Sequence, residues 1–260
     1  MAASLPLTRA RRLTLAIGAP VAVALIGWTA FNAVAWAAKG SERVHLAVQT
    51  RGGHLSVDIQ SGKVSLVPGA GHLIVLTGIA HYSIIRESVT SQSSASGVNI
   101  TSRCPVPAGQ CSLDYQVAVP AGQAVSASNG SGDVTARGQR RGVTLSTSSG
   151  DVMGSNLAGK IDLTTSSGDV TATGLAATPV TATTSSGDVS LSFVSVPRLV
   201  EVTDSSGSIT IVLPPGPTAY RVTAQTASGS THITVPTSPS SPFVITATTD
   251  SGDISIITGR

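Results

Sequence analysis

The chain has 260 residues, of which 11% are charged and 3% are aromatic, with 37 serines and 30 threonines. So few large side chains argue against the wide core of most enzymes, whereas 41% hydrophobic residues is too high for a disordered chain. The net charge of +3 arises at the N-terminus, because Arg9, Arg11, Arg12 and Lys39 precede Gly40 without any acid. From Gly40 onward the chain has twelve basic and thirteen acidic residues, so nucleic acid is not an expected partner.

An uncharged segment of 26 residues, Leu13–Ala38, follows the three arginines. As a helix it would be about 39 Å long, which exceeds the roughly 30 Å hydrocarbon core of a membrane. We therefore predict a transmembrane signal anchor at residues 13–38. The positive-inside rule then places residues 1–12 in the cytoplasm and the C-terminal domain outside the cell membrane. A cleaved signal peptide with Ala35–Ala37 as its cleavage site is the alternative, and it gives the same location.

Residues 39–124 carry a less regular β pattern. Strand-like stretches at 73–76, 82–85, 98–101 and 113–119 are separated by a polar tract, Ser88–Ser96. Since the ends of a repeat array must differ from its interior, we expect this region to cap or flank the regular part.

Cys104 and Cys111 enclose a short loop that is rich in proline and glycine. Outside the membrane, cysteines are normally oxidised, so we predict a disulfide between them. Neither a Cys-x-x-Cys spacing nor a nearby histidine pair supports a redox or metal role.

Residues 125–260 contain a repeat, seen most clearly as Thr-Ser-Ser-Gly-Asp-Val. Successive glycines are 18, 18, 19, 20, 22 and 23 residues apart. Apolar residues stand seven and five positions before each glycine and usually two and four after it, with polar residues between them. This alternation predicts a strand on each side of a tight turn. An eighth copy fits Leu55–Leu66, with its glycine at Gly62.

The insertions all fall between repeats, where prolines gather, and not at the glycine turn. We therefore expect an all-β fold, a β-solenoid resembling a parallel β-helix, with about 18–23 residues per coil, preceded by the transmembrane helix. A β-sandwich of hairpins is the main structural alternative, because a strand, a tight turn and a second strand also describe a hairpin.

The predicted turn positions combine glycine with aspartate or serine. They are Gly132, Asp133, Gly150, Asp151, Gly168, Asp169, Gly187, Asp188, Gly207, Gly229, Gly252 and Asp253. Stacked carboxylates could bind calcium, but two repeats place Ser208 and Ser230 where the others have aspartate. We expect these side chains to bond to nearby backbone N–H groups, with glycine supplying a positive φ. No metal or other cofactor is predicted.

The Leu55–Gly69 segment, the sequence Leu-Asp-Tyr-Gln-Val-Ala-Val-Pro-Ala-Gly from Leu113, and the Ser-Gly-Asp-Val repeats together resemble a bacterial family of β-strand-repeat domains of unknown function, the "putative adhesin" family. The resemblance covers residues 44–260. It implies a solenoid-like β fold and a surface location, and it carries no catalytic residues.

These observations favour a non-enzymatic, membrane-anchored surface module that binds an unidentified glycan or protein. Sensing of envelope stress is an alternative, as is a polysaccharide-cleaving enzyme, which would need converging carboxylates such as Asp162 and Glu201. The last strand ends in Ile256 and Ile257 without a cap, so weak self-association through a bare C-terminal coil is also expected.

Overall fold

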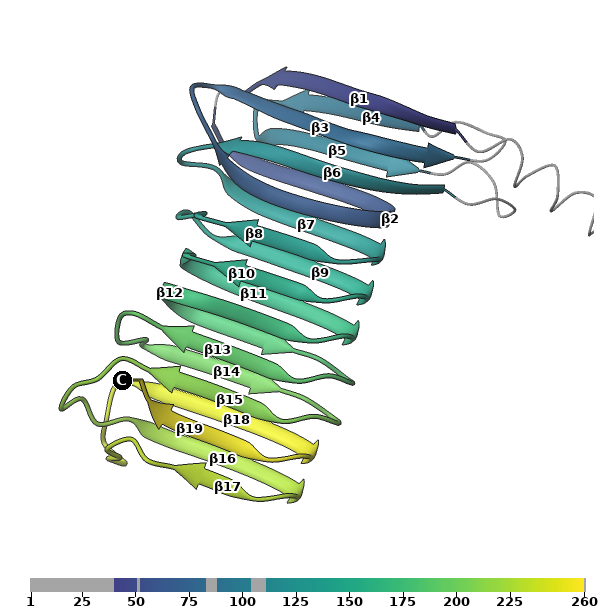
Figure 1. The fold of residues 1–260 in the computed structure, drawn as a ribbon. Coiled ribbons are helices and arrows are strands. Elements are labelled where there is room, and N and C mark those ends of the chain that lie inside the picture. The colour runs from purple at the N-terminus through teal and green to yellow at the C-terminus, as the bar shows by residue number, and fades with distance from the viewer. Residues whose placement is uncertain (1–39, 51, 83–87, 104–110, 260) are drawn as a thin grey trace, which may run out of the picture.

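The computed structural model describes residues 40–50, 52–82, 88–103 and 111–259, and Figure 1 shows their arrangement. These residues form nineteen strands. In chain order the strands are β1 (Gly40–Gln49), β2 (His54–Gly69), β3 (Leu73–Tyr82), β4 (Ser88–Ser94), β5 (Gly97–Arg103), β6 (Cys111–Pro120), β7 (Ala124–Ser131), β8 (Val134–Arg137), β9 (Val143–Ser149), β10 (Val152–Ser155), β11 (Ala158–Ser167), β12 (Val170–Thr183), β13 (Val189–Phe193), β14 (Leu199–Thr203), β15 (Ile209–Leu213), β16 (Arg221–Ser228), β17 (Thr231–Ile233), β18 (Val244–Ser251) and β19 (Ile254–Thr258).

The strands build two facing walls. Sheet A has the order β1-β3-β6-β2-β8-β10-β12-β13-β15-β19-β17. Sheet B has the order β4-β5-β2-β7-β9-β11-β12-β14-β18-β16. Pairing is parallel except for β1–β3, β3–β6 and β4–β5, which are antiparallel.

Two long strands belong to both walls. The first half of β2 pairs with β5 and β7 in sheet B, and its second half pairs with β6 and β8 in sheet A. In β12 the first half pairs within sheet A and the second half within sheet B. As a result β2, β7, β9, β11, β12, β10 and β8 form a closed ring of parallel pairings, a flattened seven-stranded barrel from which the outer strands extend at both ends.

The all-β prediction is confirmed, but the predicted β-solenoid is wrong. A solenoid would stack its coils in chain order without closing a ring. Here the ring is closed, and the C-terminal pair β18–β19 lies between the β14–β15 pair and the β16–β17 pair. The hairpin alternative is wrong as well, because the two strands that flank each glycine turn lie in opposite sheets. Period-two alternation is common to all these folds, so it could not distinguish them.

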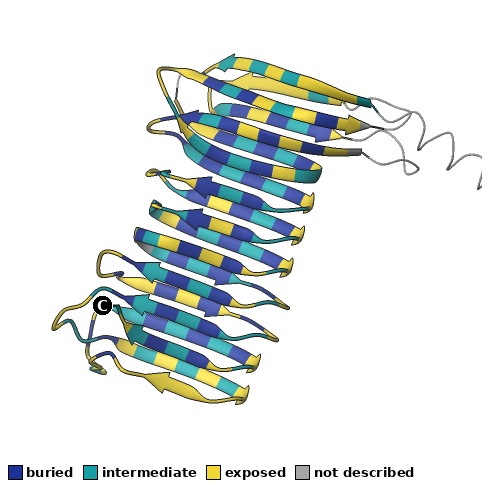
Figure 2. Cartoon of the chain, viewed as in Figure 1, coloured by how far each residue is buried: buried dark blue, intermediate teal, exposed yellow. Residues whose placement is uncertain are grey.

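The alignment of the repeats is confirmed by the pairing register. Val125 pairs with Val143, Val143 with Ile161, and Ile161 with Val180. These positions point between the two sheets and are almost completely buried. Figure 2 shows the resulting alternation of buried and exposed residues along the strands. The core between the walls is therefore built from columns of valine, isoleucine, leucine and alanine.

The N-terminal region is more regular than the sequence suggested. Leu55 pairs with Val125, which confirms the eighth copy. The polar tract predicted to separate strands is largely strand β4, which pairs with β5 along its length. It escaped prediction because an edge strand with an exposed surface needs no apolar alternation.

The predicted membrane segment at 13–38 lies outside the described residues, as does residue 39. Within the part of the chain that is described, no helix is long and apolar enough to cross a membrane.

The premise of a bare C-terminal coil is wrong. Ile256 is fully buried, and Ile257 pairs with Val212 in the neighbouring strand. The outermost strands at this end are β16 and β17, where Ile233 is 40% exposed. Self-association through the C-terminal strand therefore has no support from its position in the fold.

Candidate functional site

All seven predicted turn glycines adopt a positive φ, between +116° and +157°. Each lies against the backbone of the next turn in the stack, so that an added Cβ at Gly168 would overlap the Gly150 carbonyl oxygen. The turns thus form one straight edge of the molecule, here called the turn edge. Glycine is required at these positions both by the backbone angle and by the close approach of the neighbouring chain.

The turn aspartates form a carboxylate ladder along the turn edge. Asp133 accepts a hydrogen bond from the Asp151 backbone N–H at 3.2 Å, Asp151 from Asp169 at 3.0 Å and Asp169 from Asp188 at 2.8 Å. The prediction that these carboxylates bond to backbone N–H groups is confirmed, but the donor belongs to the adjacent turn of the stack. Their carboxylates thus connect successive turns, and no cluster of three or more potential metal ligands occurs in the described parts of the chain.

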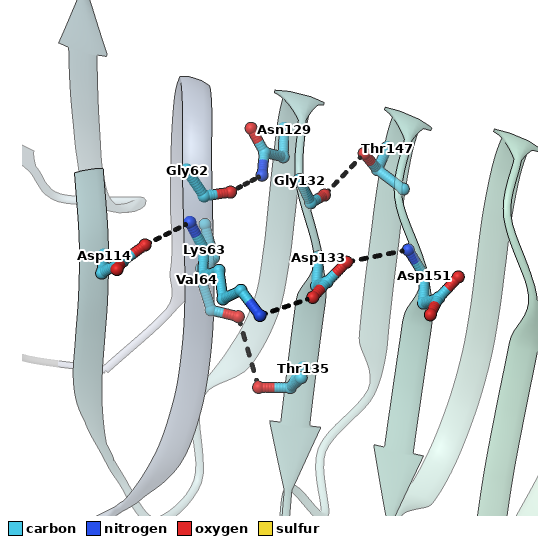
Figure 3. A network of polar contacts seen from close by, with 10 residues as sticks. All are labelled: Gly62, Lys63, Val64, Asp114, Asn129, Gly132, Asp133, Thr135, Thr147 and Asp151. Carbon is cyan, nitrogen blue, oxygen red and sulfur yellow. Dashed lines mark hydrogen bonds and ion pairs between the residues drawn. The ribbon is translucent and has the colours of Figure 1, made fainter. Parts of the chain in front are cut away.

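The turn aspartates at the two ends of the stack, Asp133 and Asp253, have different partners. Lys63 forms an ion pair with Asp133 at 3.0 Å, shown in Figure 3, and this contact lowers the pKa of Asp133 and raises that of Lys63. At the other end, Asp253 accepts hydrogen bonds from the Ser230 N–H at 2.8 Å and the Ser230 hydroxyl at 2.9 Å. These bonds lower the pKa of Asp253. Serine at position 230 therefore acts as a donor to the ladder and does not interrupt it.

A second ladder, here called the donor ladder, lies just inside the first (Figure 3), and the sequence analysis missed it. Side chains three residues before the turn glycines donate to the glycine carbonyl of the adjacent turn. Figure 3 shows Asn129 donating to Gly62 at 2.7 Å and Thr147 donating to Gly132 at 3.0 Å. Further members are Thr165 to Gly150, Thr184 to Gly168, Thr249 to Gly207 and Thr226 to Gly252. The recurrence of threonine three residues before the glycine was the signal available in the sequence.

The other predicted site residues fall into two groups. Cys104 lies outside the described residues, so the disulfide with Cys111 stays a prediction. Asp162 and Glu201 lie on the outer surface of sheet B, with Thr181 of β12 between them. Two strand spacings, about 10 Å, separate their strands, and neither residue lines either of the hollows described next.

The outer surface of sheet A carries two adjoining hollows. One, of about 550 Å³, is lined by residues that include Arg43, His45, Ile79 and Gln116. The other, of about 440 Å³, includes Thr135, Arg137, Met153 and Thr171. Ser65 of β2 lines both, so the two form one shallow groove that runs across the strands from β1 to β12.

The pairing register gives this groove a floor of polar residues that only Met153 of β10 interrupts. One outward-facing residue from each strand of sheet A falls in the same row, here called the polar row. In strand order it contains His45, Thr77, Gln116, Ser65, Thr135, Met153, Thr171, Ser190, Thr210, Ser255 and His232. Eleven strands at about 4.8 Å give the row a length of about 50 Å.

The charges beside the polar row are nearly balanced. Moving along the adjacent row, Arg43 pairs in register with Ile79, Ile79 with Asp114, and Asp114 with Lys63. Lys63 in turn meets Asp133. Positive and negative side chains alternate here, and with Arg137, which also lines the groove, three basic and two acidic side chains stand beside its hydroxyl, amide and imidazole groups. Such a surface suits a neutral, hydrogen-bonding ligand that lies across the strands.

Comparisons with known proteins give the family. The family model described as Toastrack DUF4097 matches residues 37–258. No match was found among curated proteins. The adhesin-like family of β-repeat domains expected from the sequence is confirmed.

Three solved structures are similar in part. A "putative cell adhesion protein" from Clostridium sporogenes is 12% identical, with a TM-score of 0.42, over 85% of this chain and 100% of that chain. A "putative adhesin" from Bacteroides fragilis is 10% identical, with a TM-score of 0.39, over 84% of this chain and 97% of that one. A "putative lipid binding protein" from Parabacteroides distasonis is 9% identical, with a TM-score of 0.34 and the same coverage. At these TM-scores the similarity does not bear on function, whereas the family model spans most of the sequence. The chain belongs to the Toastrack DUF4097 family.

Proposed function

We propose that this protein is a non-enzymatic, membrane-anchored module that binds an extended neutral glycan at the cell surface. The groove on sheet A is the observation that carries the proposal. It joins two hollows through Ser65 and has a floor of hydroxyl, amide and imidazole groups in register. Sugar hydroxyls both donate and accept hydrogen bonds, as do serine and threonine, so a polymer lying along the polar row would find a partner on every strand except β10, which contributes Met153.

Several properties of the groove favour a glycan over a protein. Protein interfaces have a core of large buried apolar side chains, and aromatic residues are enriched there. On this surface the exposed apolar side chains are scattered, with Ile79 44% and Met153 39% exposed. A long ligand that forms many weak hydrogen bonds needs no such core. Individual contacts of this kind are modest, and affinity would come from their repetition along the row.

Filling the groove should weaken glycan binding strongly. Ser65→Phe places a ring where the two hollows meet, and it should reduce binding at least tenfold on a glycan array probed with the full chain in detergent. The matched control is Ser146→Phe, a half-buried, outward-facing serine on β9 of sheet B. Equal loss in both variants would reject the groove as the site. If the wild type binds no glycan on the array but captures another protein in a pull-down, the ligand is instead a protein.

The uncharged segment at residues 13–38, with three arginines before it, supports the proposed location. Protease added to intact protoplasts should remove residues 40–260 from the cell surface, because the positive-inside rule favours a cytoplasmic N-terminus for the three arginines before Leu13. Protection of the domain until the membrane is permeabilised would contradict this orientation. Release of the intact domain into the medium would show that the N-terminal segment is cleaved.

A further inference from the structure

Asp204 occupies a position where the donor ladder elsewhere has a hydroxyl or an amide. It stands three residues before Gly207, as Thr184 stands before Gly187 and Thr249 before Gly252. The turn glycine next to it in the stack is Gly187. Every other member of this ladder named above donates a hydrogen bond to such a glycine carbonyl, whereas an ionised carboxylate can only accept one.

The geometry brings the two oxygens together. A Cβ placed on Gly207 would lie against the Gly187 carbonyl oxygen and 2.8 Å from Asp204 Oδ2, so both oxygens flank the same point. Asp204 Oδ1 accepts a hydrogen bond from the Ser206 N–H at 3.1 Å. Asp204 Oδ2 is buried without any hydrogen-bond partner, and the residue as a whole is only 3% exposed.

The surroundings of Asp204 disfavour its negative charge. Burial raises the pKa of this carboxyl, and the nearby carboxylates Asp188 and Asp250 raise it further. The hydrogen bonds from the Ser206 and Ser205 backbone N–H groups act in the opposite direction. On the flanking strands, the ladder neighbours Thr184 and Thr249 are uncharged.

We propose that Asp204 is a proton-dependent member of the donor ladder. In its protonated form the Oδ2–H group donates a hydrogen bond to the Gly187 carbonyl oxygen, completing the series from Gly62 to Gly252. Loss of the proton replaces this bond with a repulsion between two oxygens. The β12–β13 and β14–β15 pairs are thus held together more firmly at low pH than at high pH.

The direction of the pH dependence follows from linkage. A carboxyl whose pKa is raised on folding binds its proton more tightly in the native state. Its contribution to stability is complete below the unfolded value of about 3.9 and is lost as the pH rises through the folded pKa. Asp133 and Asp253 have lowered pKa values, so their contribution is lost only on acidification below that same value. The two effects therefore occupy different pH ranges.

Thermal unfolding of the full chain in detergent, followed by circular dichroism between pH 4.5 and 8, tests the proposal. Asp204→Asn supplies an amide donor, as Asn129 does, and Asp204→Thr supplies the hydroxyl found in the other repeats. Both should match the wild type near pH 4.5 and melt at least about 2 °C higher at pH 8. The quantity to compare is the difference in melting temperature between variant and wild type at each pH.

Two controls make the test specific. Asp169→Asn removes a charge from the carboxylate ladder and should keep the wild-type pH profile. Thr165→Asp moves a carboxyl into the donor ladder at another turn, and it should create a second loss of stability with rising pH. The ¹³C chemical shift of the Asp204 carboxyl, measured by NMR as a function of pH, gives its pKa directly. This measurement does not require reversible unfolding. A pH-independent difference for Asp204→Asn, or a titration of Asp204 at or below 3.9, would overturn the proposal.

Discussion

Replacing Gly168 with alanine should destabilise the protein by more than about 2 kcal/mol, because the change introduces two separate costs. Gly168 has a φ of +149°, which residues other than glycine rarely adopt. The added Cβ would also overlap the Gly150 carbonyl oxygen, and this atom belongs to the backbone and cannot rotate away. A shift of the Gly150 turn would also displace the Gly132 turn, because each turn glycine packs against the backbone of the turn before it.

The matched control is Gly216→Ala. Gly216 has a similar φ of +154°, but no heavy atom lies within 4 Å of an added Cβ. It therefore shares the conformational cost without the steric overlap. Urea unfolding of both variants should show a clearly larger loss for Gly168→Ala. Equal losses would mean that the backbone angle alone, and not the close stacking of the turns, explains the repeated glycine.

Leu163→Ala should lower the free energy of unfolding by about 2–5 kcal/mol. Leu163 is completely buried between the two sheets, and its register neighbours are Leu145 on β9 and Ala182 on β12. Since both strands are fixed by the closed ring, the walls have little freedom to collapse into the space that the side chain leaves. We therefore expect a cost in the upper half of that range.

Leu199→Ala is the control for this second prediction. Leu199 is also a leucine within a parallel strand of sheet B, but it is 41% exposed. Its truncation should cost less than about 1 kcal/mol, because much of its apolar surface already contacts water. A similar cost at the two positions would contradict a core formed by the inward columns.

The sequence contains enough information to predict the columns but not their order. Val125, Val143, Ile161 and Val180 could be aligned from the repeat, because one inward position must match the next when strands pair in register. The same frame also aligned Val200, Val222 and Ile245. It could not show that Ile245 pairs with both of the others, since all three have nearly the same side chain.

The closed ring was equally hidden. It depends on β2 and β12 continuing from one sheet into the other, which happens at Gly62 and around Gly174. A glycine in a repeat predicts a turn, but it does not say whether hydrogen bonding continues through that turn. The groove was missed for a related reason: the polar row joins residues from eleven strands, and which outward residues share a row depends on the spatial order of those strands.

The position of the β18–β19 pair has a consequence during protein synthesis. As the ribosome releases the chain from the N-terminus, each strand pair from β7–β8 to β14–β15 can dock on strands that have already been synthesised. The β16–β17 pair cannot, because both of its partners are β18 and β19, which emerge later. The segment from Arg221 to Ile233 therefore has none of its β-sheet partners until the last residues have been synthesised. This segment has few apolar residues, with threonine and serine between Val222 and Ile233. While it is unpaired, it is therefore less prone to aggregate than the valine-rich strands before it.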